Sequence, residues 1–286
     1  MMEFGLHHQN CIEGMRSLPE QAIDLTVTSP PYDDMRTYHD SSTWNKETFE
    51  QVATELYRIT KIGGIVVWIV ADQSIDGDET GTSFRQALYF KEIGFKLLDT
   101  MIWSKGSFSY PSNNHYPQTF EYMFVFSKGK PKTFHGIKDR RNIHAGRKLH
   151  LTYRQKDGSI IRPDLSKRTN LITSDYGVRF NVWNIPSEKH NVTGHPAVFP
   201  LDLVADHIRS WSEEGDSVLD PFAGSGTTAI ACAYLNRNFI GYEIDQAYYE
   251  MACQHIQDSI AQLQLFHPEW EEKDGRRESS ESAGDH

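Results

Sequence analysis

The tetrapeptide Ser29-Pro30-Pro31-Tyr32 combines residue types that could act on a flat ring bearing an amino group. Two successive prolines fix φ and remove two amide donors, so the carbonyl groups of Ser29 and Pro30 are held outward as hydrogen-bond acceptors. The aromatic ring of Tyr32 can stack on a planar base, a contact worth about 1–3 kcal/mol in single-stranded recognition. Acceptors on the two hydrogens of an exocyclic amino group would increase the electron density on its nitrogen. These four residues are therefore the candidate catalytic residues.

A nine-residue run forms the second candidate site, and it consists of Asp220, Pro221, Phe222, Ala223, Gly224, Ser225, Gly226, Thr227 and Thr228. Its two glycines can adopt positive φ and let a ligand approach the backbone. Free amides at the start of the following helix, together with the two threonine hydroxyls, suit an anionic group such as a carboxylate. Glu243 lies 23 positions after Asp220, at the end of a second predicted strand, where it could accept hydrogen bonds from ribose hydroxyls. We expect a cofactor at this loop.

Alternating helices and strands must position both loops. Apolar periodicity predicts helices over residues 46–61, 84–93, 199–211, 227–235 and 246–265, and strands over residues 22–28, 65–70, 95–103, 119–126, 217–220 and 238–242. Strands separated by helices imply βαβ units. The predicted fold is thus α/β, a doubly wound and mostly parallel sheet that binds ligands at the C-terminal ends of its strands.

Charge is distributed unevenly along the 286 residues, whose net charge is −10. Residues 128–168 contain 13 lysines and arginines against three acids, a local charge of +10. A polyanionic partner needs such clustered basic side chains. Apolar periodicity fails over about the same stretch, which indicates an inserted module. The acidic tail, residues 266–286, is expected to be disordered.

Both loops, in this order, resemble the β class of S-adenosylmethionine-dependent amino methyltransferases of DNA, of the bacterial restriction-modification type. The catalytic loop precedes the cofactor loop by about 190 residues, a circularly permuted motif order in a Rossmann-like sheet. Further matching stretches are Asn10-Cys11-Ile12-Glu13, Trp103-Ser104-Lys105, Phe120-Glu121-Tyr122, Phe126-Ser127-Lys128-Gly129, Val182-Trp183-Asn184-Ile185-Pro186 and the run from His195 to Pro200.

This resemblance implies S-adenosyl-L-methionine as the cofactor, packed against Phe222 with its ribose on Glu243. It also implies that the stretch with Cys11 lies near the adenine of the cofactor and that His195 lies near its methionine part. For His195, packing at a helix entry explains the residue equally well. Asn10 departs from the family pattern, in which Asp is usual, so no role is assigned to it.

Ser29 favours N4 of cytosine as the acceptor, because the N6-adenine branch of the family more usually has Asp or Asn at this position. The alternative acceptor is N6 of adenine, methylated by the same mechanism. A more distant alternative is that the substrate is RNA or an amide group of a protein. A C5-cytosine enzyme would be expected to carry a Pro-Cys pair, which the sequence lacks. The target base cannot be reached inside a duplex, so it must be flipped out.

The predicted organisation is a catalytic half over residues 1–129, a target-recognition region over residues 130–190 and a cofactor-binding half over residues 191–265. The candidate DNA-binding residues are Arg140, Arg141, Arg147, Lys148, Arg154 and Arg168. Each of these alone could equally be a solvated surface side chain. The expected partners are double-stranded DNA, a companion restriction endonuclease and a second copy of the chain. We expect no metal site, no membrane span and a cytoplasmic location.

Overall fold

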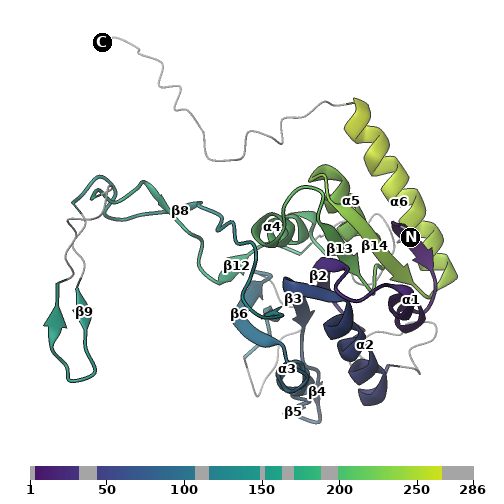
Figure 1. The fold of residues 1–286 in the computed structure, drawn as a ribbon, viewed down its shortest axis with the longest axis horizontal. Helices are drawn as coiled ribbons and strands as arrows, with labels where there is room; N and C mark the ends of the chain where they lie inside the picture. The colour runs from purple at the N-terminus through teal and green to yellow at the C-terminus, as the bar shows by residue number, and fades with distance from the viewer. Residues whose placement is uncertain are drawn as a thin grey trace. The chain divides into compact units, whose positions relative to one another are not determined.

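A computed structural model describes residues 4–31, 44–106, 116–148, 152–162, 171–187 and 199–265. Its centre is an eight-stranded sheet of order β1-β14-β13-β2-β3-β7-β6-β12 (Figure 1). The strands are β1 Gly5–His8, β2 Ile23–Thr28, β3 Thr60–Val70, β6 Lys96–Ser104, β7 Phe120–Ser127, β12 Val182–Asn184, β13 Ser217–Asp220 and β14 Asn238–Glu243. Among the described residues, β7 is the only strand of this sheet that runs antiparallel to its neighbours, and all other neighbouring strands are parallel. The predicted α/β, mostly parallel sheet is confirmed.

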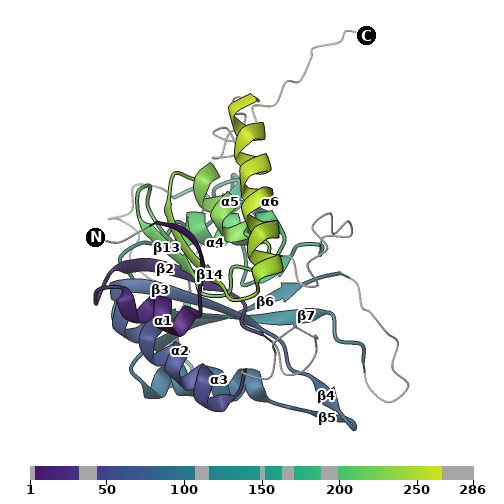
Figure 2. The same cartoon turned by 90° about the vertical axis from the view of Figure 1, so that its right-hand side faces the viewer.

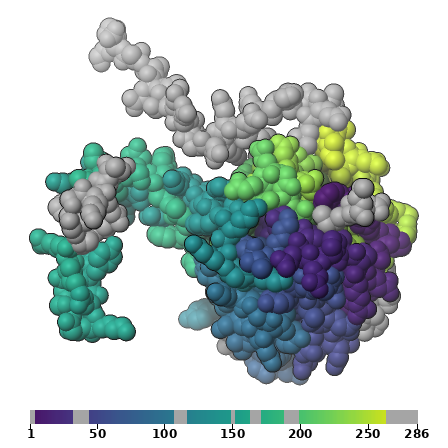
Figure 3. All heavy atoms as spheres, viewed as in Figure 1, coloured from purple at the N-terminus to yellow at the C-terminus, as the bar shows by residue number. Residues whose placement is uncertain are grey.

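Helices cover both faces of the sheet, as a doubly wound fold requires. Figure 2 shows α1 Cys11–Ser17, α2 Lys46–Ile59 and α3 Thr82–Glu92 on one face. The other face carries α4 Leu201–Trp211, α5 Thr227–Tyr234 and α6 Gln246–Leu265. In the space-filling view, the early part of the chain (purple and blue) and the green to yellow segment of α5 and α6 pack into one continuous body (Figure 3).

The boundary between α2 and β3 corrects one sequence prediction. The helix was predicted to continue to Lys61, but it ends at Ile59 and the strand begins at Thr60. Thr60 has extended backbone angles, and both its amide and its hydroxyl donate to the carbonyl of Leu56. A β-branched residue with an extended backbone, whose hydroxyl also donates to a carbonyl of the last helical turn, can end a helix without a glycine.

The N-terminal elements β1 and α1 were not predicted from the sequence. Asn10 caps α1, because its side-chain oxygen accepts a hydrogen bond from the amide of Ile12 at 2.9 Å. Gly14 lets the helix lie directly on β14, since a Cβ at this position would meet the ring of Tyr242 at 2.2 Å. The residue that departs from the family pattern, Asn10, thus has a structural role at the edge of the sheet.

Aromatic packing between the sheet and α2 and α3 forms the centre of the core. Phe90 stacks on Phe126 with ring centroids 4.7 Å apart and meets Trp68 edge-on at 5.1 Å. All three side chains are fully buried. Burial of each contributes about 1.5–3 kcal/mol, so this layer anchors β3 and α3 rigidly.

Residues 136–180 form a separate compact unit. Its short strands pair antiparallel, β8 Arg140–Arg141 with β11 Tyr176–Gly177 and β9 Tyr153–Arg154 with β10 Ile160–Ile161. The hairpin of β4 Ser74–Ile75 and β5 Asp78–Glu79 belongs to the sheet unit instead. Strand β12 lies within the range predicted as the target-recognition region, yet it pairs with β6 in the sheet. The boundaries at residues 130 and 190 stay predictions. Within the described ranges, no helix has the length and apolar character of a membrane span.

Candidate active site

The two predicted loops leave adjacent parallel strands at the same edge of the sheet. Strand β13 pairs with β2 in the register Val218 to Leu25 and Leu219 to Thr26. The glycine-rich loop begins after β13, and the Ser-Pro-Pro loop begins after β2. Parallel neighbours have their C-terminal ends at one edge, so residues about 190 positions apart in sequence come side by side.

Asp220, the last residue of β13, links the two loops directly. Its carboxylate accepts hydrogen bonds from the hydroxyl of Thr28 at 2.7 Å, from the hydroxyl of Thr228 at 2.6 Å and from the amide of Phe222 at 3.1 Å. The side chain is 2% exposed. Burial raises the pKa of Asp220, and these three hydrogen bonds oppose the rise. The geometry makes Asp220 a residue that holds the loops together, and its direct contact with a cofactor stays a prediction.

The glycines of the cofactor loop adopt the backbone conformation that the sequence predicted. Gly224 has φ +50° and Gly226, the residue that caps α5, has φ +79°. A Cβ on Gly226 would lie 2.9 Å from Cδ1 of Ile256 on α6, so the helix packs closely here. The amides of the first turn of α5 have no acceptor within the helix and are oriented toward its N-terminal end.

Three hydroxyl groups in this loop are buried, those of Ser225, Thr227 and Thr228. The Ser225 and Thr227 oxygens lie 3.2 Å apart, and the carbonyl of Ser225 accepts from His255 at 2.8 Å. Pro221 and Ala223 are buried as well, and the amide of Ala223 donates to the carbonyl of Tyr242. The loop is therefore held to both β14 and α6.

Glu243 ends β14 beside the glycine loop. One of its carboxylate oxygens accepts from the amide of Gly224 at 3.0 Å, and the other accepts from the amide of Asp245 at 2.9 Å. The side chain is half-buried, and burial raises its pKa against the effect of these hydrogen bonds. The carboxylate is fixed in orientation and keeps lone pairs for a ligand.

Cys11 lies near Glu243, because β1 pairs with β14 and places His8 opposite Glu243. Burial raises the pKa of the Cys11 thiol to about 12, and the charge of Glu243 contributes to the rise. The thiol is therefore neutral at physiological pH. A neutral, half-buried sulfur can pack on a ligand but is no nucleophile.

The donor set fits a nucleoside cofactor with an attached amino acid. Glu243 provides an oriented acceptor for hydroxyl groups, and the first turn of α5 provides amides for a carboxylate. Phe222 is half-buried and offers a ring for packing. It meets Trp44 edge-on with centroids 5.2 Å apart. Trp44 was missed in the sequence because no motif marks it.

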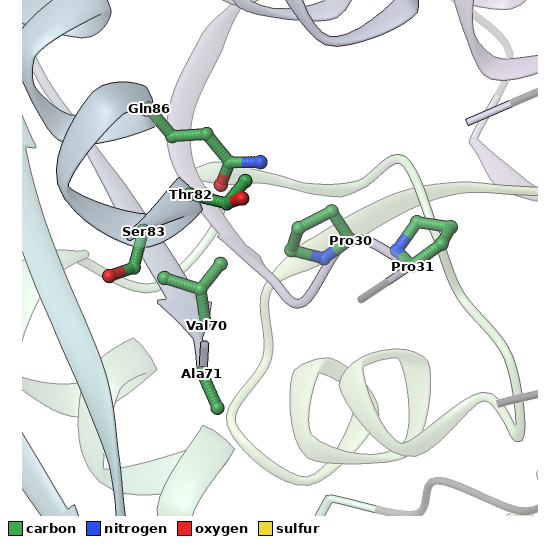
Figure 4. A pocket seen from close by; sticks show the side chains of 7 residues that line it. All are labelled: Pro30, Pro31, Val70, Ala71, Thr82, Ser83 and Gln86. Atoms are coloured by element: carbon green, nitrogen blue, oxygen red, sulfur yellow. The ribbon is translucent and has the colours of Figure 1, made fainter. Parts of the chain in front are cut away.

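A pocket lies beside the Ser-Pro-Pro loop, and Figure 4 shows its lining by Pro30, Pro31, Val70, Ala71, Thr82, Ser83 and Gln86. Asp72 fixes one wall of it, because its carboxylate accepts from the amide of Ser83 at 2.9 Å and from the Ser83 hydroxyl. None of the residues that α3 contributes was predicted. The polar residue Asp72, just after a buried strand, was the one sequence signal that could have pointed to them.

The predicted DNA-binding residues of the described chain lie in the unit of residues 136–180. Arg141, Arg147, Lys148 and Arg154 are exposed. Arg140 packs over the ring of Phe180 at 4.4 Å and donates to the carbonyl of Val178.

Three predicted site residues, Tyr32, His195 and Arg168, fall outside the described residues, as does the acidic tail. The described part of the chain holds no cluster of His, Cys, Asp and Glu suited to a metal ion.

Known proteins resemble this chain in both sequence and fold. The orphan methyltransferase M.BamHII of Bacillus amyloliquefaciens is 52% identical over 246 residues, which cover 83% of this chain and 90% of that protein. The solved complex of a putative DNA modification methylase from Thermus thermophilus with S-adenosyl-L-methionine is 26% identical with a TM-score of 0.60, covering 90% of this chain and 95% of that one. The cytosine-N4-specific PvuII DNA methyltransferase shares the fold, with a TM-score of 0.63 at 21% identity over 90% of this chain and 91% of that one.

A family model settles the assignment. The model of the N6 and N4 methyltransferases, described as DNA methylase, matches residues 23–254. This range includes both loops and the segment between them. The predicted kinship with the β class of amino methyltransferases is confirmed. The chain belongs to the DNA methylase family of N6 and N4 amino methyltransferases.

Proposed function

We propose that this DNA methylase transfers a methyl group from S-adenosyl-L-methionine to N4 of a cytosine flipped out of double-stranded DNA. The observation that carries the proposal is the hydrogen bond of 2.7 Å between Thr28 and Asp220. It joins the strand before Ser29 to the strand before the glycine loop. Cytosine is proposed because Ser29 stands where the N6-adenine branch more usually has Asp or Asn.

S-adenosyl-L-methionine is the methyl donor, and it supplies a methyl group that its sulfonium centre already makes electrophilic. Glu243 would accept hydrogen bonds from its ribose, and the amides at the start of α5 would bind its carboxylate. Phe222 and Cys11 would pack on its apolar surfaces. His195 is proposed to contact its methionine part. The protein therefore has to align two reactants, and it needs no covalent intermediate.

The Ser-Pro-Pro-Tyr loop would act on the amino group of the base. Ser29 Oγ and the Pro30 carbonyl are the proposed acceptors for its two hydrogens, and Tyr32 is proposed to stack on the ring. Pro30 and Pro31 line the pocket beside this loop. Preorganised acceptors of this kind lower the barrier without rearranging during the reaction. Flipping the base costs a few kcal/mol, which DNA contacts must offset.

The unit of residues 136–180 is proposed as the recognition region for the DNA sequence. The residues proposed to contact phosphates or guanine edges are Arg140, Arg141, Arg147, Lys148, Arg154 and Arg168.

A companion restriction endonuclease is proposed on the type II names of several relatives, such as M.MthZI of Methanothermobacter thermautotrophicus, although M.BamHII is named an orphan. We further propose a homodimer and a cytoplasmic location, where bacterial DNA lies.

The deciding experiment is a product analysis. Unmethylated bacterial DNA is incubated with the full chain and labelled S-adenosyl-L-methionine, digested to nucleosides and measured by mass spectrometry. N4-methylcytosine that disappears in Ser29→Ala and Tyr32→Ala variants supports the proposal. N6-methyladenine would overturn the choice of cytosine while leaving the amino-methylation mechanism. Sequencing of the methylated DNA then gives the recognition site.

A further inference from the structure

Gln86 is a buried polar side chain that lines the pocket, and only the oxygen of its amide has a hydrogen-bond partner among the described residues. It is 6% exposed, and its Oε1 accepts a hydrogen bond from Nε1 of Trp68 at 2.9 Å. Within the described ranges, its Nε2 makes no hydrogen bond. In Figure 4 the side chain extends from α3, with its amide nitrogen on the side of Pro30 and Pro31.

Trp68 fixes which end of this amide faces the pocket. The indole N–H can only donate, so the atom that it contacts must be the oxygen of Gln86 and not the nitrogen. Trp68 itself is fully buried and packed against Phe90, so it cannot turn to release the amide. Gln86 therefore presents an N–H donor to the pocket in a fixed orientation.

We infer that Gln86 is a specificity-determining residue that donates a hydrogen bond to N3 of the target cytosine; this inference rests on the proposed function. In cytosine the acceptor N3 lies next to the amino group at N4. Acceptors on the Ser-Pro-Pro loop and a donor from Gln86 would together match this edge. Thymine carries an oxygen and an N–H at the two corresponding positions. Its oxygen would face the acceptors of the loop, and its N–H would face the donor of Gln86. A buried donor left without its acceptor discriminates strongly between ligands.

The test is a cycle of one variant and one base analogue. A duplex with the mapped recognition site is made with cytosine or with 3-deazacytosine, which has a C–H in place of N3, at the target position. The wild-type chain is expected to lose about tenfold in kcat/KM on the analogue. Gln86→Met is expected to lose about tenfold on cytosine and nothing further on the analogue. An equal analogue penalty in both proteins would overturn the inference, because the two changes would then be independent.

A second variant separates specificity from folding. Gln86→Glu keeps an acceptor for Trp68 but replaces the donor with a carboxylate oxygen facing N3. Its kcat/KM is expected to fall more than about tenfold and to recover partly at acid pH, where the protonated carboxyl can donate again. Gln51→Glu, an equal charge change at an exposed position of α2, serves as the matched control. Wild-type activity in Gln86→Glu would also overturn the inference.

The proposed function and the role of Gln86 can be overturned separately. If the wild-type chain forms N4-methylcytosine but the effects of Gln86→Met and of 3-deazacytosine are independent, the proposed function stands and the role of Gln86 is overturned. N6-methyladenine would overturn the choice of cytosine, and the same cycle with 1-deazaadenine would decide whether Gln86 reads the ring nitrogen beside the amino group. Failure to methylate either base would overturn both.

Discussion

The sheet unit and the unit of residues 136–180 are built in opposite ways. In the sheet unit, strands such as β2 and β13 are buried at every position. Of the described residues between 136 and 180, none is buried. Several large apolar side chains there are exposed instead, among them Ile143 at 92% and Phe180 at 66%.

This contrast fits the tasks that we propose for the two units, alignment of the reactants in the sheet unit and DNA recognition in residues 136–180. Two reactants can be aligned only by groups that are themselves fixed, and burial with complete hydrogen bonding fixes Asp220. A DNA duplex is large, so its recognition needs exposed basic and apolar side chains. Such a surface gains little stability from the hydrophobic effect. We therefore expect substitutions in the sheet unit to change stability and those in residues 136–180 to change DNA binding.

The largest effect should come from Asp220→Ala. This variant leaves the buried hydroxyls of Thr28 and Thr228 without their acceptor, which should cost about 2–4 kcal/mol in the free energy of unfolding. Activity should fall by about a hundredfold or more, because the two loops lose their link. Urea unfolding and methyl-transfer assays measure these quantities.

Asp139→Ala is the matched control in the other unit. Asp139 pairs with Arg179 at 2.8 Å on the surface, and exposed pairs contribute less than about 1 kcal/mol. Equal losses of stability in the two variants would contradict the contrast between the units.

Two glycine substitutions compare the two units at a similar backbone conformation. Gly226→Ala adds a methyl group 2.9 Å from Ile256 at φ +79°, so we expect a loss of about 2–3 kcal/mol and a higher KM for S-adenosyl-L-methionine. Gly146→Ala has a similar φ of +74° with no atom within 4 Å of the new Cβ. It should lower the free energy of unfolding by only about 1–2 kcal/mol, which is the cost of placing a side chain at positive φ. Thermal unfolding would have to rank the two variants in this order.

Single basic residues of the second unit should affect binding only. Arg147→Ala or Arg154→Ala is expected to weaken DNA binding a few-fold and to reduce the salt slope of log K by about 1, with unchanged Tm. In the sheet unit, Arg58 donates to the carbonyls of Met15 and Leu18, so Arg58→Ala should lower Tm and leave the salt slope as it is. Fluorescence anisotropy across a salt series distinguishes these outcomes.

The smallest effect concerns the pH dependence of stability. Burial raises the pKa of Asp220, so the folded state takes up a proton at higher pH than the unfolded state does. As pH falls from 7 toward 4, the wild type should gain stability relative to Asp220→Asn, which has no proton to bind. A difference in unfolding free energy that stays constant over this range would show that the carboxylate is not destabilised by burial.

Much of the fold and part of the site followed from local patterns. The strand over 217–220 and the helix over 246–265 were predicted with their observed ends, because apolar periodicity is a local property. The short β1 and β12 were missed, since a few residues carry too little pattern and their pairing with β14 and β6 is decided elsewhere in the chain. Gln86 was missed for a related reason: it reads as one polar position on an amphipathic helix.

The two loops, their order along the chain and the chemistry that their residue types allow all follow from the amino-acid sequence. Positive φ at Gly224 and Gly226 also follows locally, because only glycine adopts this conformation at little cost. The contact of Thr28 with Asp220, and that of Gln86 with Trp68 beside the prolines, became visible only in the folded chain. These contacts depend on strand order and on the packing of α3 against the sheet. Both result from the balance of burial over the whole chain, which no local window of sequence contains.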